Sequence, residues 1–220
     1  MTFLELQTDL DNRISAAKVT GFWSVAAKKE WLNQAGQRVC DYKPWEFLKT
    51  ALYLTTRDSR EYYDYPVGTD KGLKYNSIYN IVIADEDYLE KDGRTRKKWD
   101  DFQRDKLREG DELIYSNHSK WYFLYPVPED GKEMVIYGLR RWVTLVDDTD
   151  EPISPREFDE AIVRIALAAC MRKAKKWNEA NAEVSEILSP EGGQLMTLWD
   201  QEGDEGPRGY GGQMITSRFL

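Results

Sequence analysis

The spacing of apolar residues changes twice along this chain of 220 residues, from a helical repeat to a period of two and back. Both ends place apolar side chains three or four positions apart, which is typical of amphipathic helices. The middle, from about Leu48 to Val146, alternates apolar and polar residues and indicates β-strands. This order predicts an α+β protein, in which the terminal helices form a bundle and a mainly antiparallel β domain is inserted between them.

Two helices are predicted in the N-terminal part. The second begins after Ser24, a favoured N-cap residue, and ends before Pro44, which cannot continue a helix. The expected buried stripes are Phe3, Leu6, Leu10 and Ile14 in the first helix, and Trp31, Leu32, Ala35, Val39 and Cys40 in the second.

The middle of the chain contains several candidate strands. "TALYLTT" and "EYYDYP" are predicted to form a hairpin, and "DELIYSNHSKWYFLYP" to form two strands joined around Asn117 and His118. "EMVIYGLRRWVTLV" is expected to be one long strand with Val135, Tyr137, Leu139, Val143 and Leu145 on one face. Several strands are apolar on both faces, which favours a closed barrel, a sandwich, or a sheet that meets a neighbour.

A long helix is predicted after the strands. Ser154, Pro155 and Glu157 have the types and spacing of an N-cap, a first helical residue and a capping box. "SPEGG" then interrupts the helical pattern, and a glycine-rich end follows. The predicted divisions are N-terminal helices (1–47), the β domain (48–146) with a charged segment (90–111), C-terminal helices (147–200) and an extended tail (201–220).

Composition limits the function classes. A formal net charge of -8 argues against a protein that wraps nucleic acid, because neutralising phosphates needs a basic surface. No apolar run is long enough to span a bilayer, and the acidic N-terminal stretch does not resemble a secretory signal, so we expect a protein made and kept in a cytoplasm and no membrane partner. Cys40 and Cys170 are expected to be small buried apolar residues rather than a disulfide.

No catalytic signature is apparent. His118 is the only histidine and is explained by turn polarity, and one histidine with two distant cysteines cannot form a typical zinc site. The carboxylates of "VDDTDEP" lack calcium-loop spacing and are expected to solvate a loop and favour a helix N-terminus. The basic run "GRTRKK" is followed directly by acids. We therefore expect no catalytic, cofactor or metal site and no enzyme.

Aromatic residues are unusually common, with 8 Trp and 13 Tyr. Most are expected in the core, yet Trp and Tyr also anchor protein interfaces. The candidate contacts with other copies of the chain or with partner proteins are Trp99, Phe102, Trp121, Tyr125 and Trp142.

Three stretches together resemble the head-to-tail adaptor (connector) proteins of tailed bacteriophages. They are "EWLNQAGQRVCDYKPWEFL", "YYDYPVGTDKGLKYNSIYNIVI" and "YGLRRWVTLVDDTDEPISPREFDEAIVRIALAACMRKA". The resemblance covers most of the chain as an order of elements. "SPEGG" and the long charged segment depart from the family's pattern.

The resemblance implies a structural virion protein at the head–tail junction. It implies a ring of copies, a dodecamer, beneath the portal protein, which extends the DNA channel and carries tail or nozzle proteins, while DNA passes without specific binding. The C-terminal tail would dock on the portal or on a neighbouring adaptor through Tyr210, Met214, Ile215, Arg218, Phe219 and Leu220.

Three other functions stay open at this point. A tail-completion or nozzle ring protein would share the ring but would not dock on the portal. A carbohydrate-binding module would need Trp121 and Trp142 at the surface, and a DNA-binding protein would work through "GRTRKK".

Overall fold

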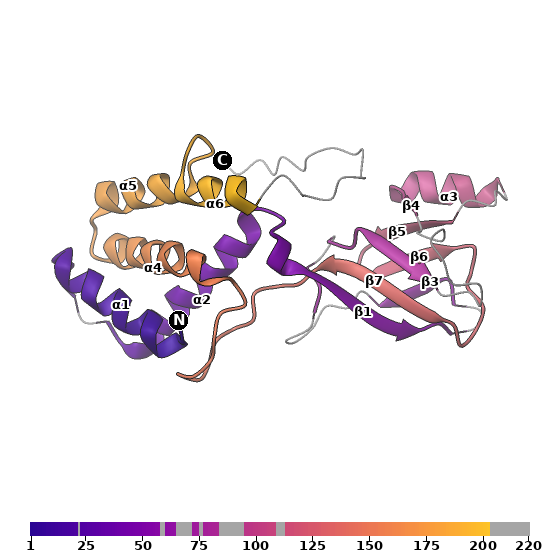
Figure 1. The fold of residues 1–220 in the computed structure, drawn as a ribbon. Coiled ribbons are helices and arrows are strands. Elements are labelled where there is room, and N and C mark those ends of the chain that lie inside the picture. The colour runs from indigo at the N-terminus through magenta and orange to yellow at the C-terminus, as the bar shows by residue number, and fades with distance from the viewer. Residues whose placement is uncertain are drawn as a thin grey trace.

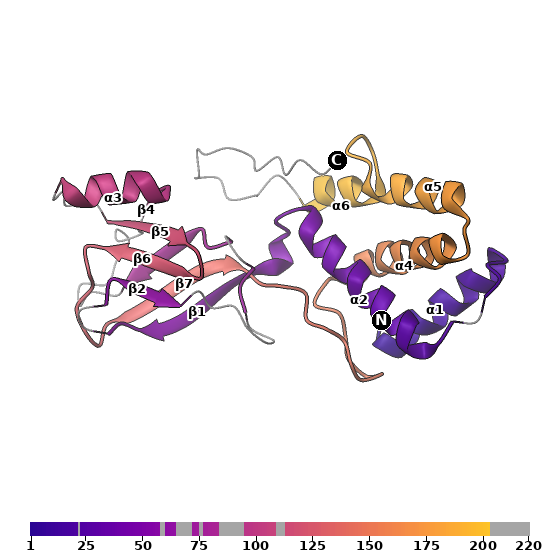
Figure 2. The same ribbon diagram turned by 180° about the vertical axis from the view of Figure 1, so that it is seen from behind.

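A computed structural model describes residues 1–21, 23–57, 60–64, 72–74, 77–83, 95–108 and 113–202. All described helices except α3 (Trp99–Leu107) gather on one side of the molecule, and the strands lie on the other side together with α3 (Figures 1 and 2). The described helices are α1 (Phe3–Ala16), α2 (Val25–Tyr42), α3 (Trp99–Leu107), α4 (Asp159–Lys173), α5 (Trp177–Leu188) and α6 (Gln194–Glu202). The described strands are β1 (Lys49–Thr55), β2 (Tyr62–Asp64), β3 (Asn80–Ile83), β4 (Thr95–Arg96), β5 (Ile114–His118), β6 (Trp121–Tyr125) and β7 (Glu133–Leu139).

The helical region has its own hydrophobic core, built on α4, which packs against α1, α2 and α5. All nine apolar residues predicted for the stripes of α1 and α2 are buried, as expected for faces at helical spacing. The predicted N-cap is confirmed, because the Ser24 hydroxyl accepts a hydrogen bond from the Ala27 amide at 3.2 Å. α5 ends at Leu188 and α6 begins at Gln194, on either side of "SPEGG".

The strands form two small sheets rather than a closed barrel within the described residues. Sheet A has the order β1-β7-β3 and is antiparallel. Sheet B has the order β2-β6-β5-β4, in which only the β4–β5 pair is parallel. A second hydrophobic core is shared by the two sheets, with Ile81, Met134 and Ile136 from sheet A and Tyr63, Tyr115, Tyr122 and Leu124 from sheet B. The fold is therefore α+β, as predicted.

The predicted pairing of β1 with β2 is wrong. All seven residues of β1 pair with β7 without a gap, from Lys49 opposite Leu139 to Thr55 opposite Glu133. β2 pairs instead with β6, where the Tyr63 and Tyr122 rings stack at 5.5 Å. Cross-strand aromatic contacts of this kind outweigh closeness in sequence.

Two further details of the strands differ from prediction. His118 is the last residue of β5, and the turn lies at Ser119 and Lys120, with Ser119 in the left-handed region at φ 56. β7 stops at Leu139, and its most deeply buried side chains are Met134 and Ile136, which are on the face opposite to the predicted one.

The predicted capping box at Ser154 is also wrong. The chain first makes a short 3₁₀ turn, Arg156–Phe158, and the buried Ser154 hydroxyl has no hydrogen-bond partner among the described residues. The Phe158 ring instead packs against two other aromatic rings, with its centroid 4.7 Å from that of Trp45 and 5.1 Å from that of Phe47. Packing of this large ring sets the start of α4 in place of the polar cap.

A joint connects the helical region with the sheets. Asn33 of α2 accepts hydrogen bonds from the Trp142 indole at 3.1 Å and the Leu145 amide at 2.8 Å, and donates to the Leu145 carbonyl at 2.9 Å. The Trp142 ring lies directly on Gly36, where an added Cβ would be 2.3 Å from it. On the other side of the joint, the Arg140 guanidinium donates to the Phe47 carbonyl at 3.0 Å. Both chain connections between the regions are held together here.

We expect Gly36→Ala to destabilise the protein, although alanine is the better helix former by about 1 kcal/mol. The new methyl group would overlap the Trp142 ring and lower the free energy of unfolding by about 1–3 kcal/mol, as measured by chemical denaturation. In a Trp142→Leu background, Gly36→Ala should lower the free energy of unfolding by a smaller amount. An equal cost in both backgrounds would contradict the proposed contact.

We expect both cysteines to be unreactive in the folded chain. Both are free and buried, and burial raises the pKa of the Cys40 and Cys170 thiols from 9.0 to about 12. At pH 8 a thiol reagent should modify neither residue until denaturant is added. Because the unfolded thiols ionise first, their contribution to stability is complete below pH 9 and is lost as the pH rises towards 12. The decline should be shallower in a Cys40→Ala/Cys170→Ala variant.

Candidate interaction surfaces

Helix α3 covers only part of the outer face of sheet B. Phe102 of α3 is fully buried on this face, as are Ile114 and Ser116 of β5. The neighbouring strands β2 and β6 extend beyond the helix. We call the partly exposed residues Tyr62, Trp99, His118, Trp121, Phe123 and Tyr125 the aromatic strip.

Five of the six rings in the aromatic strip, all except Tyr125, form a continuous series of ring contacts. The Trp99 ring stacks on His118 at 4.3 Å between centroids and lies 4.6 Å from Phe123. Tyr62, which is 50% exposed, lies 5.7 Å from Phe123 and 5.9 Å from Trp121. These contacts preorganise an aromatic surface that another molecule can cover with little loss of side-chain entropy.

Polar groups fix the end of the strip at β2. The Trp121 indole donates a hydrogen bond to the Asp64 carboxylate at 3.1 Å, and the Lys120 ammonium lies 5.0 Å from the centre of the Trp121 ring. Lys106 of α3 forms an ion pair with Glu61 at 2.6 Å, which ties the helix to the residue immediately before β2.

Three of the five predicted contact residues, Trp99, Trp121 and Tyr125, are in the aromatic strip. Phe102 and Trp142 are buried inside the chain, at 0% and 7% exposure, and so leave little surface for another molecule. Sugar binding through Trp121 and Trp142 together loses support for the same reason. The predicted tail residues Tyr210, Met214, Ile215, Arg218, Phe219 and Leu220 lie outside the described residues.

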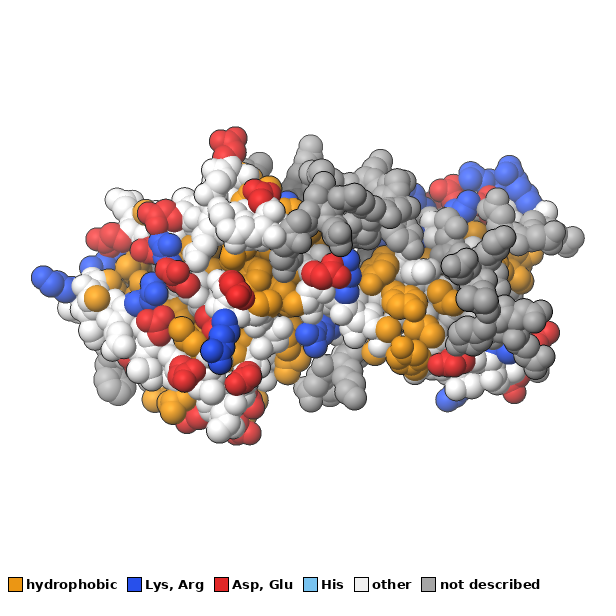
Figure 3. Space-filling model, viewed as in Figure 1, with side chains coloured by type: hydrophobic (Ala, Val, Ile, Leu, Met, Phe, Trp, Pro, Cys, Tyr) orange, Lys and Arg blue, Asp and Glu red, His pale blue; other side chains and the backbone are white. Residues whose placement is uncertain are grey.

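The outer face of sheet A is a second apolar surface. The strand register and the alternation of side chains place Ala51, Tyr53, Val82, Val135 and Tyr137 on the face opposite to the core between the sheets. Tyr53 is 68% exposed. Hydrophobic side chains gather over these strands in Figure 3. Strands that are apolar on both faces thus have one face in the core and the other at the surface.

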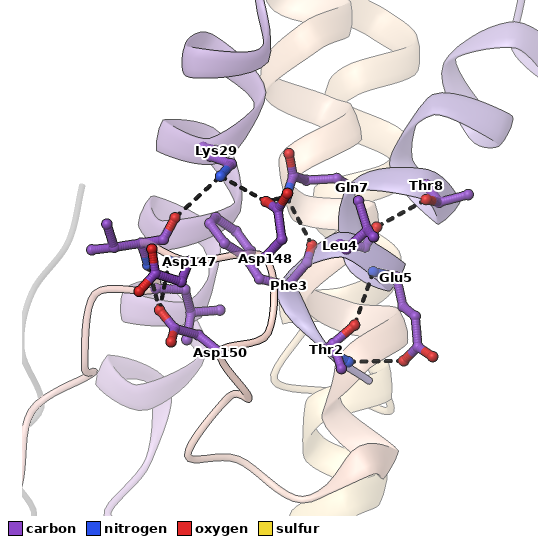
Figure 4. A network of polar contacts seen from close by, with 12 residues as sticks. Thr2, Phe3, Leu4, Glu5, Gln7, Thr8, Lys29, Asp147, Asp148 and Asp150 are labelled. Atoms are coloured by element: carbon purple, nitrogen blue, oxygen red, sulfur yellow. Dashed lines mark hydrogen bonds and ion pairs between the residues drawn. The ribbon is translucent and has the colours of Figure 1, made fainter.

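The acidic segment 147–150 has a structural role, shown in Figure 4. Its backbone carbonyls accept hydrogen bonds from the first amides of α1, Phe3 to Asp150 at 2.7 Å and Leu4 to Asp148 at 3.1 Å. Asp148 also pairs with Lys29 of α2 at 2.8 Å, and the hydrogen bond from Lys29 is the main cause of its lowered pKa. The segment therefore joins α1 to α2, whereas the sequence had suggested an interaction with the helix that follows.

The basic run "GRTRKK" is partly neutralised, as its neighbouring acids suggested. Lys97 forms an ion pair with Asp105 of α3 at 3.3 Å. Among the described residues, no group of three or more His, Cys, Asp or Glu side chains is placed to hold a metal ion. In the same part of the chain, no helix is long and apolar enough to cross a membrane.

A family model described as SU10 adaptor protein matches residues 1–203, a span that includes every described helix and strand. The chain belongs to this family of structural head-to-tail adaptor proteins of bacteriophages, which confirms the resemblance seen in the sequence. A search of curated proteins found no match.

We expect Phe102→Ala to release α3 from sheet B. Removing a fully buried ring should lower the free energy of unfolding by about 3–5 kcal/mol. Leu107→Ala, in the same helix but at a side chain that is 83% exposed, is the matched control and should change it by no more than about 0.5 kcal/mol. Chemical denaturation of both variants compares the two costs, and similar costs would show that Phe102 does not anchor the helix.

Proposed function

We propose that the protein forms a ring beneath the portal protein of a tailed phage, extends its DNA channel and provides the attachment platform for tail or nozzle proteins. Membership of the adaptor family supports the role at the head–tail junction. On this proposal the ring is a dodecamer, it is assembled in the bacterial cytoplasm, and DNA passes through it without sequence-specific contacts.

The observation that carries the ring proposal is the presence of two different apolar surfaces on opposite sides of the stacked sheets. One is the outer face of sheet A, with Tyr53 exposed, and the other is the aromatic strip on sheet B, with Tyr62 exposed. A closed ring needs two unlike faces on each subunit, because each copy contacts its neighbours head to tail. Tyr and Trp are enriched in such contacts.

We propose the predicted division of labour between the parts of the chain. Residues 1–47 and 147–200 would form the stiff helical part, and residues 48–146 the domain that makes lateral contacts. Two separate hydrophobic cores, one among the helices and one between the sheets, support this division. The tail of residues 201–220 would dock on the portal, with Met214, Ile215, Phe219 and Leu220 as apolar anchors.

We expect portal binding to depend on the tail. The full chain and a chain lacking residues 203–220 should be mixed separately with the portal protein of the same phage and imaged by electron microscopy. Cutting after Glu202 keeps α6, whose Leu195 is buried in the helical core. A ring stacked on the portal should form with the full chain and be absent with the truncated one.

The control is a full-length Phe219→Ala/Leu220→Ala variant, which keeps the length of the tail and should weaken the stack through the loss of apolar contact. A bare portal in the presence of the full chain would exclude the adaptor position. A stack that survives truncation would leave the ring in place and refute the tail as its anchor, and a ring that forms without any contact with the portal would favour the tail-completion or nozzle role.

A further inference from the structure

Two helices of the helical region end at the same place. The C-terminus of α1 and the turn from α4 to α5 lie together at the end of the molecule farthest from the sheets (Figures 1 and 2). A direct contact joins them, because the Lys176 ammonium donates a hydrogen bond to the Ala17 carbonyl at 3.2 Å. The exposed side chains at the end of α1 and in the turn from α4 to α5 therefore belong to one surface.

Both helices end with the same hydrogen-bond pattern. After α1 the Val19 amide bonds to the Ile14 carbonyl at 3.1 Å, and after α4 the Lys176 amide bonds to the Met171 carbonyl at 2.9 Å. This pattern needs a left-handed residue just before the donor, and glycine is the usual choice. Here the residues are lysines, Lys18 at φ 48 and Lys175 at φ 62.

A lysine in this conformation is unfavourable, because its Cβ crowds the backbone. Only three described residues other than glycine have a positive φ, and two of them are these lysines. Both side chains are exposed, and neither forms a hydrogen bond or ion pair with any described residue. No side-chain contact thus explains lysine at either position, and backbone strain without such a contact points to a function.

Three more cations surround this pair. Arg172 and Lys173 are in the last turn of α4, and Lys176 follows Lys175. None of the three forms an ion pair with a carboxylate in the described part of the chain, and the nearby Asp11 is paired with Lys28 at 2.7 Å. We call Lys18, Arg172, Lys173, Lys175 and Lys176 the basic end. In Figure 3, Lys and Arg side chains lie at this end of the molecule, with Asp and Glu side chains beside them.

The helix dipoles account for only part of this charge. Each helix C-terminus is equivalent to roughly half a negative charge, so two termini offset about one of the five cations. The remaining positive charge is concentrated on a chain whose formal net charge is -8. Such a local excess attracts a polyanion.

We propose that the basic end binds the phosphate backbone of duplex DNA without sequence specificity. Four of its five cations are lysines, which are depleted in protein–protein interfaces and act as point charges towards phosphate. The proposal goes beyond the adaptor role, because it assigns a surface of the chain to contact with the passing DNA.

The test is a Lys18→Gly/Lys175→Gly variant of the full chain, which removes two charges and also relieves the two strained positions. Binding of a fluorescent random-sequence duplex is measured by anisotropy from low to moderate salt. For the wild type we expect binding that weakens steeply with salt. For the variant we expect weaker binding, a slope of log K against log salt that is shallower by about 2, and a higher thermal unfolding midpoint.

Ser119→Gly is the matched control, because it relieves the third left-handed residue without removing a charge. It should raise the unfolding midpoint and leave DNA binding unchanged. Arg172→Gln/Lys173→Gln tests the charge without changing a strained position and should weaken binding in the same way as the glycine variant.

Absence of salt-dependent binding by the wild type would overturn the proposal. Equal affinity and slope in the wild type and the Lys18→Gly/Lys175→Gly variant would also overturn it. If the variant bound DNA normally but failed to assemble with the portal protein, the basic end would be a protein contact instead. Portal binding that depends on residues 203–220 is measured separately, so either proposal can fail without the other.

Discussion

The placement of Trp142 on Gly36 is the contact on which the arrangement of this protein depends. The chain leaves the helices once, through Phe47, and returns once, through Trp142. Asn33 fixes the returning segment on α2 with both its oxygen and its nitrogen, and Arg140 holds the carbonyl of the departing segment. Because these hydrogen bonds are made by buried or half-buried groups, they define one geometry for the connection.

This fixed connection sets how the outer faces of the two β-sheets are oriented relative to the helices. Sheet A and sheet B share one core and turn apolar surfaces outwards on both sides, one with Tyr53 and the other with Tyr62 and Trp121. A soluble monomer has little use for two such surfaces. A subunit whose sheets are held at a set angle to its helices can present both surfaces to neighbours in a repeating way.

The sequence predicted the helices better than the strands, for a physical reason. Helical stripes such as those of α1 and α2 are local patterns, and Ser24 and Pro44 mark the limits of α2 within a few residues. Strand pairing is not local, so the alternation in β1 could not show that its partner is β7, at the far end of the strand region. The start of α4 was misjudged because a polar capping pattern competed with the packing of Phe158 against Trp45.

The candidate surfaces were only partly visible in the sequence. The abundance of Trp and Tyr indicated an interaction protein, but the same residue type is exposed at Trp177 and buried at Trp142. Burial of Trp142 depends on Gly36, more than a hundred residues earlier, and no signal in the sequence links the two. The basic end was missed because Lys18 and Lys175 lie far apart in the chain and become neighbours only through folding.

The antiparallel pairing of β1 with β7 has a mechanical consequence. Lys49 and Leu139 are paired at the joint, so both strands leave the helices side by side and in the same direction in space. A force that pulls the sheets away from the helices is therefore divided between two covalent strands, and the ladder between them is neither unzipped nor sheared. The linkage therefore resists twisting as well as tension.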